Sequence, residues 1–93
     1  MDKKEARRIL AQELAKYRRE SYADLQRLFK AVDAYEVTAP SGANYQIEIQ
    51  AVWDDKPNGN LRVMGGIDDG GLRAYVPLTD GFILSPSGKF IGE

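Results

Sequence analysis

The chain has 93 residues, of which 43% are hydrophobic and 29% charged, and its formal net charge is −1. These values are typical of one soluble globular domain over residues 1–93 and argue against disorder, which combines low hydrophobicity with a large net charge. The sequence contains no cysteine and no histidine, which excludes disulfides, thiolate metal sites, a cysteine nucleophile and a Ser-His-Asp triad.

The two parts of the chain differ in composition. All nine glycines and all four prolines lie after residue 39. Residues 1–30 carry nine basic and five acidic side chains, whereas residues 31–93 carry four basic and nine acidic ones. We therefore predict an α+β fold with a helical part over 1–31 and a sheet part over 34–93. One helix, or a bent helix pair, should pack on one face of a four- to six-stranded antiparallel meander.

The first helix is predicted from about Asp2 to Arg19, because apolar residues recur at three- and four-residue steps: Ala6, Ile9, Leu10, Leu14 and Tyr17. Glu13 is expected at the rim of this stripe, paired with a neighbouring base. Ser21 and Asp24 resemble a capping box, which predicts a second helix to about Lys30. Its inner face should hold Tyr22, Leu25, Leu28, Phe29 and Val32.

Alternation of apolar and polar residues predicts the strands. The clearest one places Tyr45, Ile47, Ile49, Ala51 and Trp53 on one buried face. Shorter alternating runs lie near residues 35–37, before this strand, and near 61–67, 72–76 and 82–84 and at Phe90, after it. The Pro-Ser-Gly sequences at 40–42 and 86–88 predict β-turns, and Asn58-Gly59, Asp69-Gly70 and Asp80-Gly81 predict hairpin turns.

The outward positions of the predicted sheet indicate a protein interface. Arg62, Met64, Arg73 and Tyr75 should form a mixed apolar and cationic patch, a composition typical of interfaces. Glu48 should face solvent and pair across the strands with Arg62 or Arg73. The favoured interpretation is a non-enzymatic protein that acts by protein–protein interaction, with another protein or a second copy as partner.

Nucleic-acid binding is the alternative. Five cations lie on the helix face opposite the apolar stripe and could contact phosphates or an acidic partner: Lys4, Arg7, Arg8, Arg18 and Arg19. The sequence pI of about 5.4 argues against a polyanionic partner.

A cation site is the third hypothesis, for a metal-binding module or metal-dependent enzyme. It would use loop aspartates that converge at one end of the sheet: Asp54, Asp55, Asp68, Asp69 and Asp80. Asp-Gly pairs also suit turns for conformational reasons alone, so no catalytic residue, metal ligand or cofactor is assigned. No apolar run approaches the roughly 20 residues that span a bilayer, and a cytoplasmic protein without a membrane partner is expected.

Five stretches carry a resemblance: ELAKYR at 13–18, SYADL at 21–25, YQIEI at 45–49, IDDGG at 67–71 and PLTDGF at 77–82. They are similar to small bacterial proteins of uncharacterised function. The resemblance implies a stand-alone bacterial protein and supplies no activity or ligand.

Overall fold

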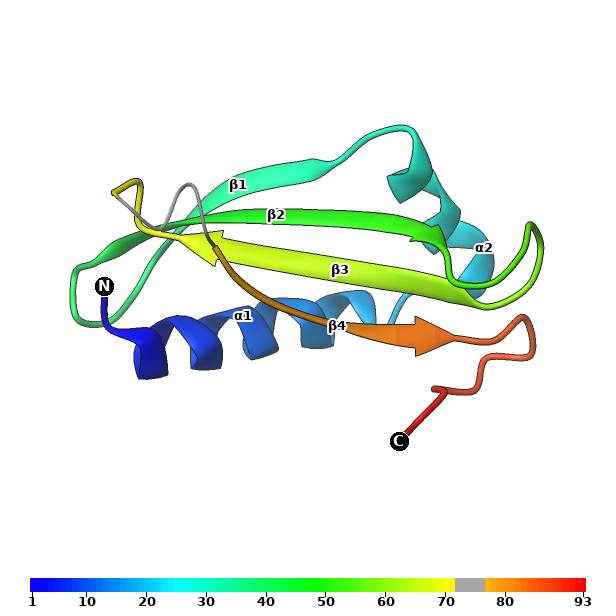
Figure 1. Cartoon of the computed structure of the whole chain (residues 1–93). Helices are drawn as coiled ribbons and strands as arrows, with labels where there is room; N and C mark the ends of the chain where they lie inside the picture. Colours follow the sequence, from blue (N-terminus) through cyan, green and yellow to red (C-terminus); the bar gives the residue numbers. More distant parts are fainter. Residues whose placement is uncertain (72–76) are drawn as a thin grey trace.

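The computed structural model describes residues 1–71 and 77–93 and shows an α+β fold with an antiparallel sheet, as predicted (Figure 1). Its elements are α1 (Lys3–Tyr17), α2 (Tyr22–Leu25), the 3₁₀-helix η1 (Gln26–Phe29), β1 (Asp33–Thr38), β2 (Asn44–Trp53), β3 (Leu61–Asp68) and β4 (Leu78–Leu84). The strands form a meander in the order β1-β2-β3-β4, and every neighbouring pair is antiparallel. The predicted strand at 72–76 lies outside the described residues.

Helix α1 begins and ends close to the predicted bounds. The Asp2 carboxylate caps it by accepting a 3.0 Å hydrogen bond from the Glu5 backbone N–H, and Arg18 is its C-terminal cap. The apolar stripe lies against the sheet, and its residues Ala6, Ile9, Leu10, Leu14 and Tyr17 are all buried. Periodicity and the cap together therefore account for this helix.

The second predicted helix is shorter than expected. Ser21 Oγ accepts from the Asp24 N–H, so the predicted cap is present, but the α-helix ends at Leu25 and continues as η1. Val32 is 50% exposed, which contradicts its predicted inner position. The chain has already left η1 at this point and enters β1 at the next residue.

The inner face of the sheet is the face that packs against α1 (Figure 1). Alternate residues of β2 are buried there, as the alternation predicted: Tyr45, Ile47, Ile49 and Ala51. Gly65 of β3 sets how closely α1 can approach. A Cβ at this position would lie 2.9 Å from Leu10 Cδ1 and 3.2 Å from Leu14 Cδ2, so any other residue would require these side chains to shift.

Both predicted Pro-Ser-Gly turns are confirmed, and the hairpin turn predicted at Asp80-Gly81 is wrong. Gly42 and Gly88 adopt φ values of +90° and +87°, and each closes a turn after Pro-Ser. Asp80-Gly81 instead lies inside β4. A Cβ on Gly81 would collide with the Val63 carbonyl oxygen. Glycine at this position therefore allows β4 to lie beside β3 and does not form a turn. Its N–H donates to Asp80 Oδ1 at 2.8 Å.

The C-terminal segment, residues 85–93, returns along β4. Leu84 and Phe90 form a single bridge at the position of the short run predicted at Phe90, and the Ile91 N–H donates to the Ile83 carbonyl at 2.9 Å. Arg18 then ties this segment to α1. Its guanidinium lies 4.8 Å from the ring centroid of Phe90 and 2.8 Å from the Glu93 carboxylate.

Candidate functional site

The outer face of the sheet, opposite α1, carries exposed carboxylates at the end near the β1–β2 turn. Glu36 stands opposite Gln46, whose Nε2 donates to it at 2.9 Å. Glu48 is exposed, as predicted, but its neighbour on β3 is Gly66. Arg62 pairs with Asp54 instead, so the expected pairing of Glu48 with Arg62 is wrong, and the alternative partner, Arg73, lies outside the described residues. We call Glu36 and Glu48 the acidic half of the outer face.

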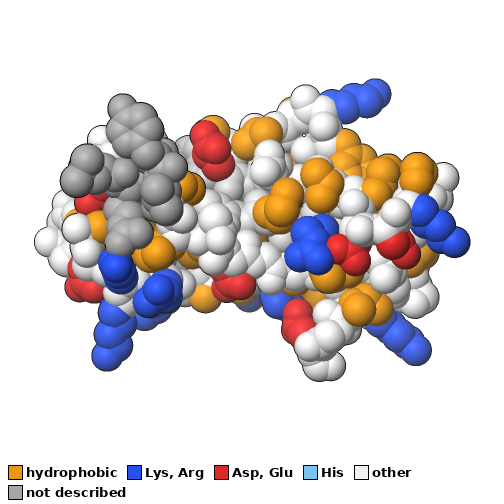
Figure 2. All heavy atoms as spheres, in the orientation of Figure 1, with side chains coloured by type: hydrophobic (Ala, Val, Ile, Leu, Met, Phe, Trp, Pro, Cys, Tyr) orange, Lys and Arg blue, Asp and Glu red, His pale blue; other side chains and the backbone are white. Residues whose placement is uncertain are grey.

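The other end of the outer face is apolar. Val52 and Ile91 are 42% and 41% exposed, and Met64 and Ile83 are half-buried beside them. We call these four residues the apolar half. Figure 2 shows hydrophobic side chains gathered over the half of the molecule away from the N-terminus, with charged side chains between them. Exposed clusters of this kind are typical of contact surfaces rather than of ordinary protein surface.

Arg62 lies within the apolar half, between Val52 and Ile83 in the strand register. Its charge is paired with Asp54, since the Nη2–Oδ1 distance is 2.6 Å and the Nε–Oδ1 distance is 2.8 Å. Asp54 is itself held in the β2–β3 hairpin by its N–H, which donates to the Asn60 carbonyl at 2.8 Å. The guanidinium is thus paired with the hairpin, although the Arg62 side chain remains 46% exposed.

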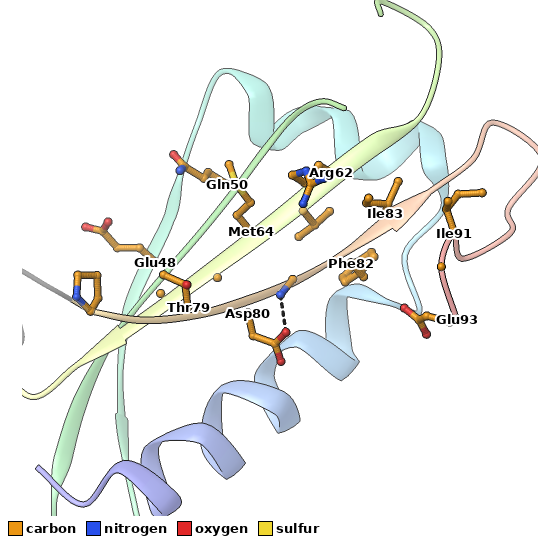
Figure 3. A pocket seen from close by; sticks show the side chains of 16 residues that line it. Glu48, Gln50, Arg62, Met64, Thr79, Asp80, Phe82, Ile83, Ile91 and Glu93 are labelled. Carbon is orange, nitrogen blue, oxygen red and sulfur yellow. Dashed lines mark hydrogen bonds between the residues drawn. The ribbon is translucent and has the colours of Figure 1, made fainter. Parts of the chain in front are cut away.

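An open groove of about 680 Å³ runs over β3 and β4 and joins the two halves of the outer face. Its lining includes Glu48, Met64 and Ile83, and Gly66 and Gly81 leave it without side chains at two positions. Figure 3 shows Glu48, Gln50 and Met64 projecting on the same side of the sheet, with Arg62, Ile83 and Ile91 farther along. The groove is shallow and mixed in character, which suits a macromolecular contact better than an enclosed small molecule.

The sheet patch predicted from sequence can be placed in part. Arg62 and Met64 both lie on the outer face and line the groove. Arg73 and Tyr75 lie outside the described residues. Sequence reasoning did not single out Val52, Ile83 or Ile91, although the even-numbered position of Val52 in the β2 alternation marks it as outward-facing.

The cations predicted on one helix face fall into two groups. Lys4, Arg7 and Arg19 are exposed and have no ion-pair partner within residues 1–71 and 77–93, and exposed Arg8 lies 3.9 Å from Glu5. Arg18 is engaged with Glu93 and the aromatic rings beside it. We call Lys4, Arg7, Arg8 and Arg19 the basic ridge. Figure 2 shows Lys and Arg side chains projecting at its lower left, toward the N-terminal end of α1 in Figure 1.

The aspartates proposed as cation ligands do not meet. Asp54 and Asp55 lie in the β2–β3 hairpin, Asp68 is the last residue of β3 and Asp69 follows it, and Asp80 lies within β4. Four accept backbone hydrogen bonds: Asp55 from Lys56 and Asn60, Asp68 from Gly70, Asp69 from Gly71 and Asp80 from Gly81. The Gly71 N–H helps to hold the pKa of Asp69 below its ordinary value. Over the described part of the chain, no three potential ligands of the His, Cys, Asp or Glu type gather as a metal ion would require.

Glu5 is a buried carboxylate that sequence reasoning missed. It is 9% exposed and its Oε1 accepts from Tyr45 Oη at 2.8 Å and from Ser41 Oγ at 2.9 Å. The pKa of Tyr45 is raised to about 12, mainly by burial and next by its hydrogen bond to Glu5. The signal was present in the sequence, because Glu5 is four residues before Ile9 and therefore on the apolar stripe.

Glu13 is the second buried carboxylate on the stripe. It pairs with Lys16 at 3.0 Å, as predicted, but it is 7% exposed, so the expected rim position is wrong, and its Oε1 also accepts from Tyr35 Oη at 2.9 Å. Burial and this contact raise the pKa of Tyr35 to about 12, and burial with the Asp33 hydrogen bond raises the pKa of Tyr17 further. These tyrosines are neutral donors that attach α1 to the sheet. They face the core and not the groove, so they offer no acid–base pair to a bound molecule.

Comparison with known proteins adds no relative. No protein-family model matches the sequence, and no curated protein or solved structure is significantly similar to it. Among the helices of the described residues, none combines the length and apolarity needed to cross a membrane.

Proposed function

We propose that this protein is a non-enzymatic binding module that contacts a protein through the outer face of its sheet. The observation that carries the proposal is the apolar half, two exposed and two half-buried hydrophobic residues on the side of the sheet opposite α1. The fixed Arg62–Asp54 pair supplies a charged feature of defined position among them. Apolar residues around an oriented arginine are enriched at protein interfaces.

Capture from a native lysate tests this proposal. The double variant V52D/I91D places two charges on the apolar half at exposed positions, whereas A23D adds a charge on exposed α2. We expect a stoichiometric partner, retained after nuclease treatment, to be held by the wild type and by A23D and lost by V52D/I91D. Circular dichroism of all three proteins reports whether they fold. Identical sets of captured proteins would rule out the apolar half as the binding surface.

Nucleic-acid binding through the basic ridge is the second candidate, because Lys4, Arg7 and Arg19 are exposed without an acidic partner in the described residues. Mobility-shift assays with mixed-sequence DNA and RNA test it. Binding should weaken steeply between about 50 mM and 200 mM salt and should fall in R7E. The absence of a shift at the lower salt concentration would dismiss this candidate.

The same proposal treats the protein as cytoplasmic and bacterial, without a cofactor or catalytic centre. The lack of histidine and cysteine supports the non-enzymatic part, since these residues supply most general bases and thiol nucleophiles.

A further inference from the structure

Two opposite sides of this molecule carry complementary surfaces. The solvent side of α1 bears the basic ridge, and exposed Ala11 and Ala15 lie along the same helix. The outer face of the sheet bears the acidic half and the apolar half. Small residues on α1 would permit a second molecule to approach this helix closely. The groove that would receive the helix has no side chain at Gly66 or at Gly81.

The charges on these two sides lie at the same end of the molecule. Ser41 in the β1–β2 turn donates to Glu5 at 2.9 Å, so α1 begins under that turn, which adjoins the acidic half (Figure 1). Tyr17 donates to Asp33 at 2.8 Å, so α1 ends under the start of β1. Lys4 and Arg7 therefore lie toward the same end of the molecule as Glu36, on the far side of the sheet.

We propose that the groove is occupied by α1 of a second copy of this chain, in a head-to-tail arrangement. Stacking by translation, without rotation, would bring the N-terminal cations of the basic ridge over the acidic half. It would also bring Ala11 and Ala15 over the region between Gly66, Gly81 and the apolar half. This inference rests on the proposed function, since it names the partner that the outer face would bind.

Charge favours this occupant over the symmetric alternative. If two outer faces met, Glu36 and Glu48 of both copies would lie in one interface, where like charges repel. The head-to-tail contact instead joins carboxylates to Lys4 and Arg7, which have no ion-pair partner within residues 1–71 and 77–93. Because these groups are exposed, each ion pair is weak and salt-sensitive, and association should be weak at physiological salt. A heterologous contact of this kind also leaves one free surface at each end of the assembly.

Sedimentation velocity of the purified protein tests the proposal. At about 0.01 M salt, where the Debye length is about 30 Å, the average mass should rise above 10.4 kDa with protein concentration. At about 1 M salt, where the Debye length is about 3 Å, the protein should again be monomeric.

Charge-exchange variants test which surfaces meet. E48K and R7E should each reduce association, and the double variant R7E/E48K should restore association because the charges are exchanged. D24K and K56E make the same charge changes at exposed positions elsewhere and should associate like the wild type.

Three results would overturn the proposal. A monomer under every condition would exclude self-association. Association strengthened by E48K but unchanged in R7E would indicate a contact between two outer faces, because the substitution relieves the repulsion between their carboxylates. Association reduced to the same extent by K56E as by R7E would indicate a general effect of net charge. If self-association is absent while V52D/I91D still loses a lysate partner, this inference fails and the proposed function remains.

Discussion

Single side chains determine how α1 attaches to the sheet, and the two that matter most are acids on an apolar stripe. Glu5 and Glu13 are 9% and 7% exposed, and each accepts a hydrogen bond from a tyrosine of the sheet. A buried carboxylate is costly unless its lone pairs are satisfied. These contacts therefore select one position of α1 along the sheet, where an apolar surface alone would tolerate sliding.

Removing one tyrosine hydroxyl should show how much free energy a buried carboxylate costs when it loses a hydrogen-bond donor. In Y45F, Glu5 would keep Ser41 as its hydroxyl donor and lose a buried hydrogen bond. We expect a loss of about 1–3 kcal/mol in the free energy of unfolding, measured by urea denaturation. Y22F makes the same chemical change where Tyr22 donates to the Gly59 carbonyl from a half-buried position, and it should cost less. Equal losses would contradict the role given to Glu5.

The same tyrosines predict how stability depends on pH. Folding raises the pKa of Tyr45 and Tyr35 from an ordinary value of 10 to about 12, so the folded state favours the neutral phenol. Their contribution should be complete below pH 10 and lost as the pH rises from 10 toward 12. Urea unfolding across this range should show a falling midpoint, with a shallower fall in Y45F. A midpoint that stays constant through this window would be inconsistent with buried, hydrogen-bonded tyrosines.

At the scale of elements, the helix–sheet contact depends on a strand position without a side chain. Gly65 faces Leu10 and Leu14, whereas its neighbour Gly66 faces outward and a Cβ there would have no atom closer than 3.8 Å. The two glycines are adjacent in sequence yet face different environments. Their substitution therefore separates the effect of packing from the general effect of glycine in a strand.

We expect G65A to lower the free energy of unfolding by about 1–3 kcal/mol, because the added methyl group overpacks the contact with α1. G66A should be neutral or slightly stabilising, since alanine restricts the unfolded chain and meets open space. Thermal and urea denaturation of both variants provide the measurement. A larger loss in G66A than in G65A would mean that α1 does not pack on this strand.

The C-terminal segment depends on one helix-cap residue. Arg18 contacts the rings of Phe82 and Phe90 at 4.8 Å and pairs with Glu93, whose pKa this contact lowers. In R18A, we expect faster hydrogen exchange at the Ile91 amide and little change in the exchange of β2 amides, because the segment would detach locally. R19A is the matched control, since Arg19 is exposed and lies one residue away. Unchanged exchange at Ile91 in R18A would contradict this attachment.

At the scale of the whole molecule, strong periodicity made α1 and β2 predictable. The failures have local causes: Asp80-Gly81 has turn composition but is drawn into β4 by contact with β3, and the helix expected to Lys30 changes to 3₁₀ geometry after Leu25. For the candidate site, alternation placed Arg62 and Met64 on the outer face. It could not show that Arg62 pairs with Asp54 or that Ile91 returns beside Ile83, since both depend on how the chain turns back.

The outer boundary of the sheet at β4 has a consequence for the behaviour of the protein at high concentration. Pro77 has no N–H to donate, the N–H of Gly81 is held by Asp80, and the C-terminal segment occupies the strand at Leu84. Unpaired strand edges are templates on which other chains add and aggregate, and prolines, charges and covering segments protect against this. β4 is therefore a poor starting point for edge-to-edge aggregation, and any growth of the sheet by strand addition would begin at β1.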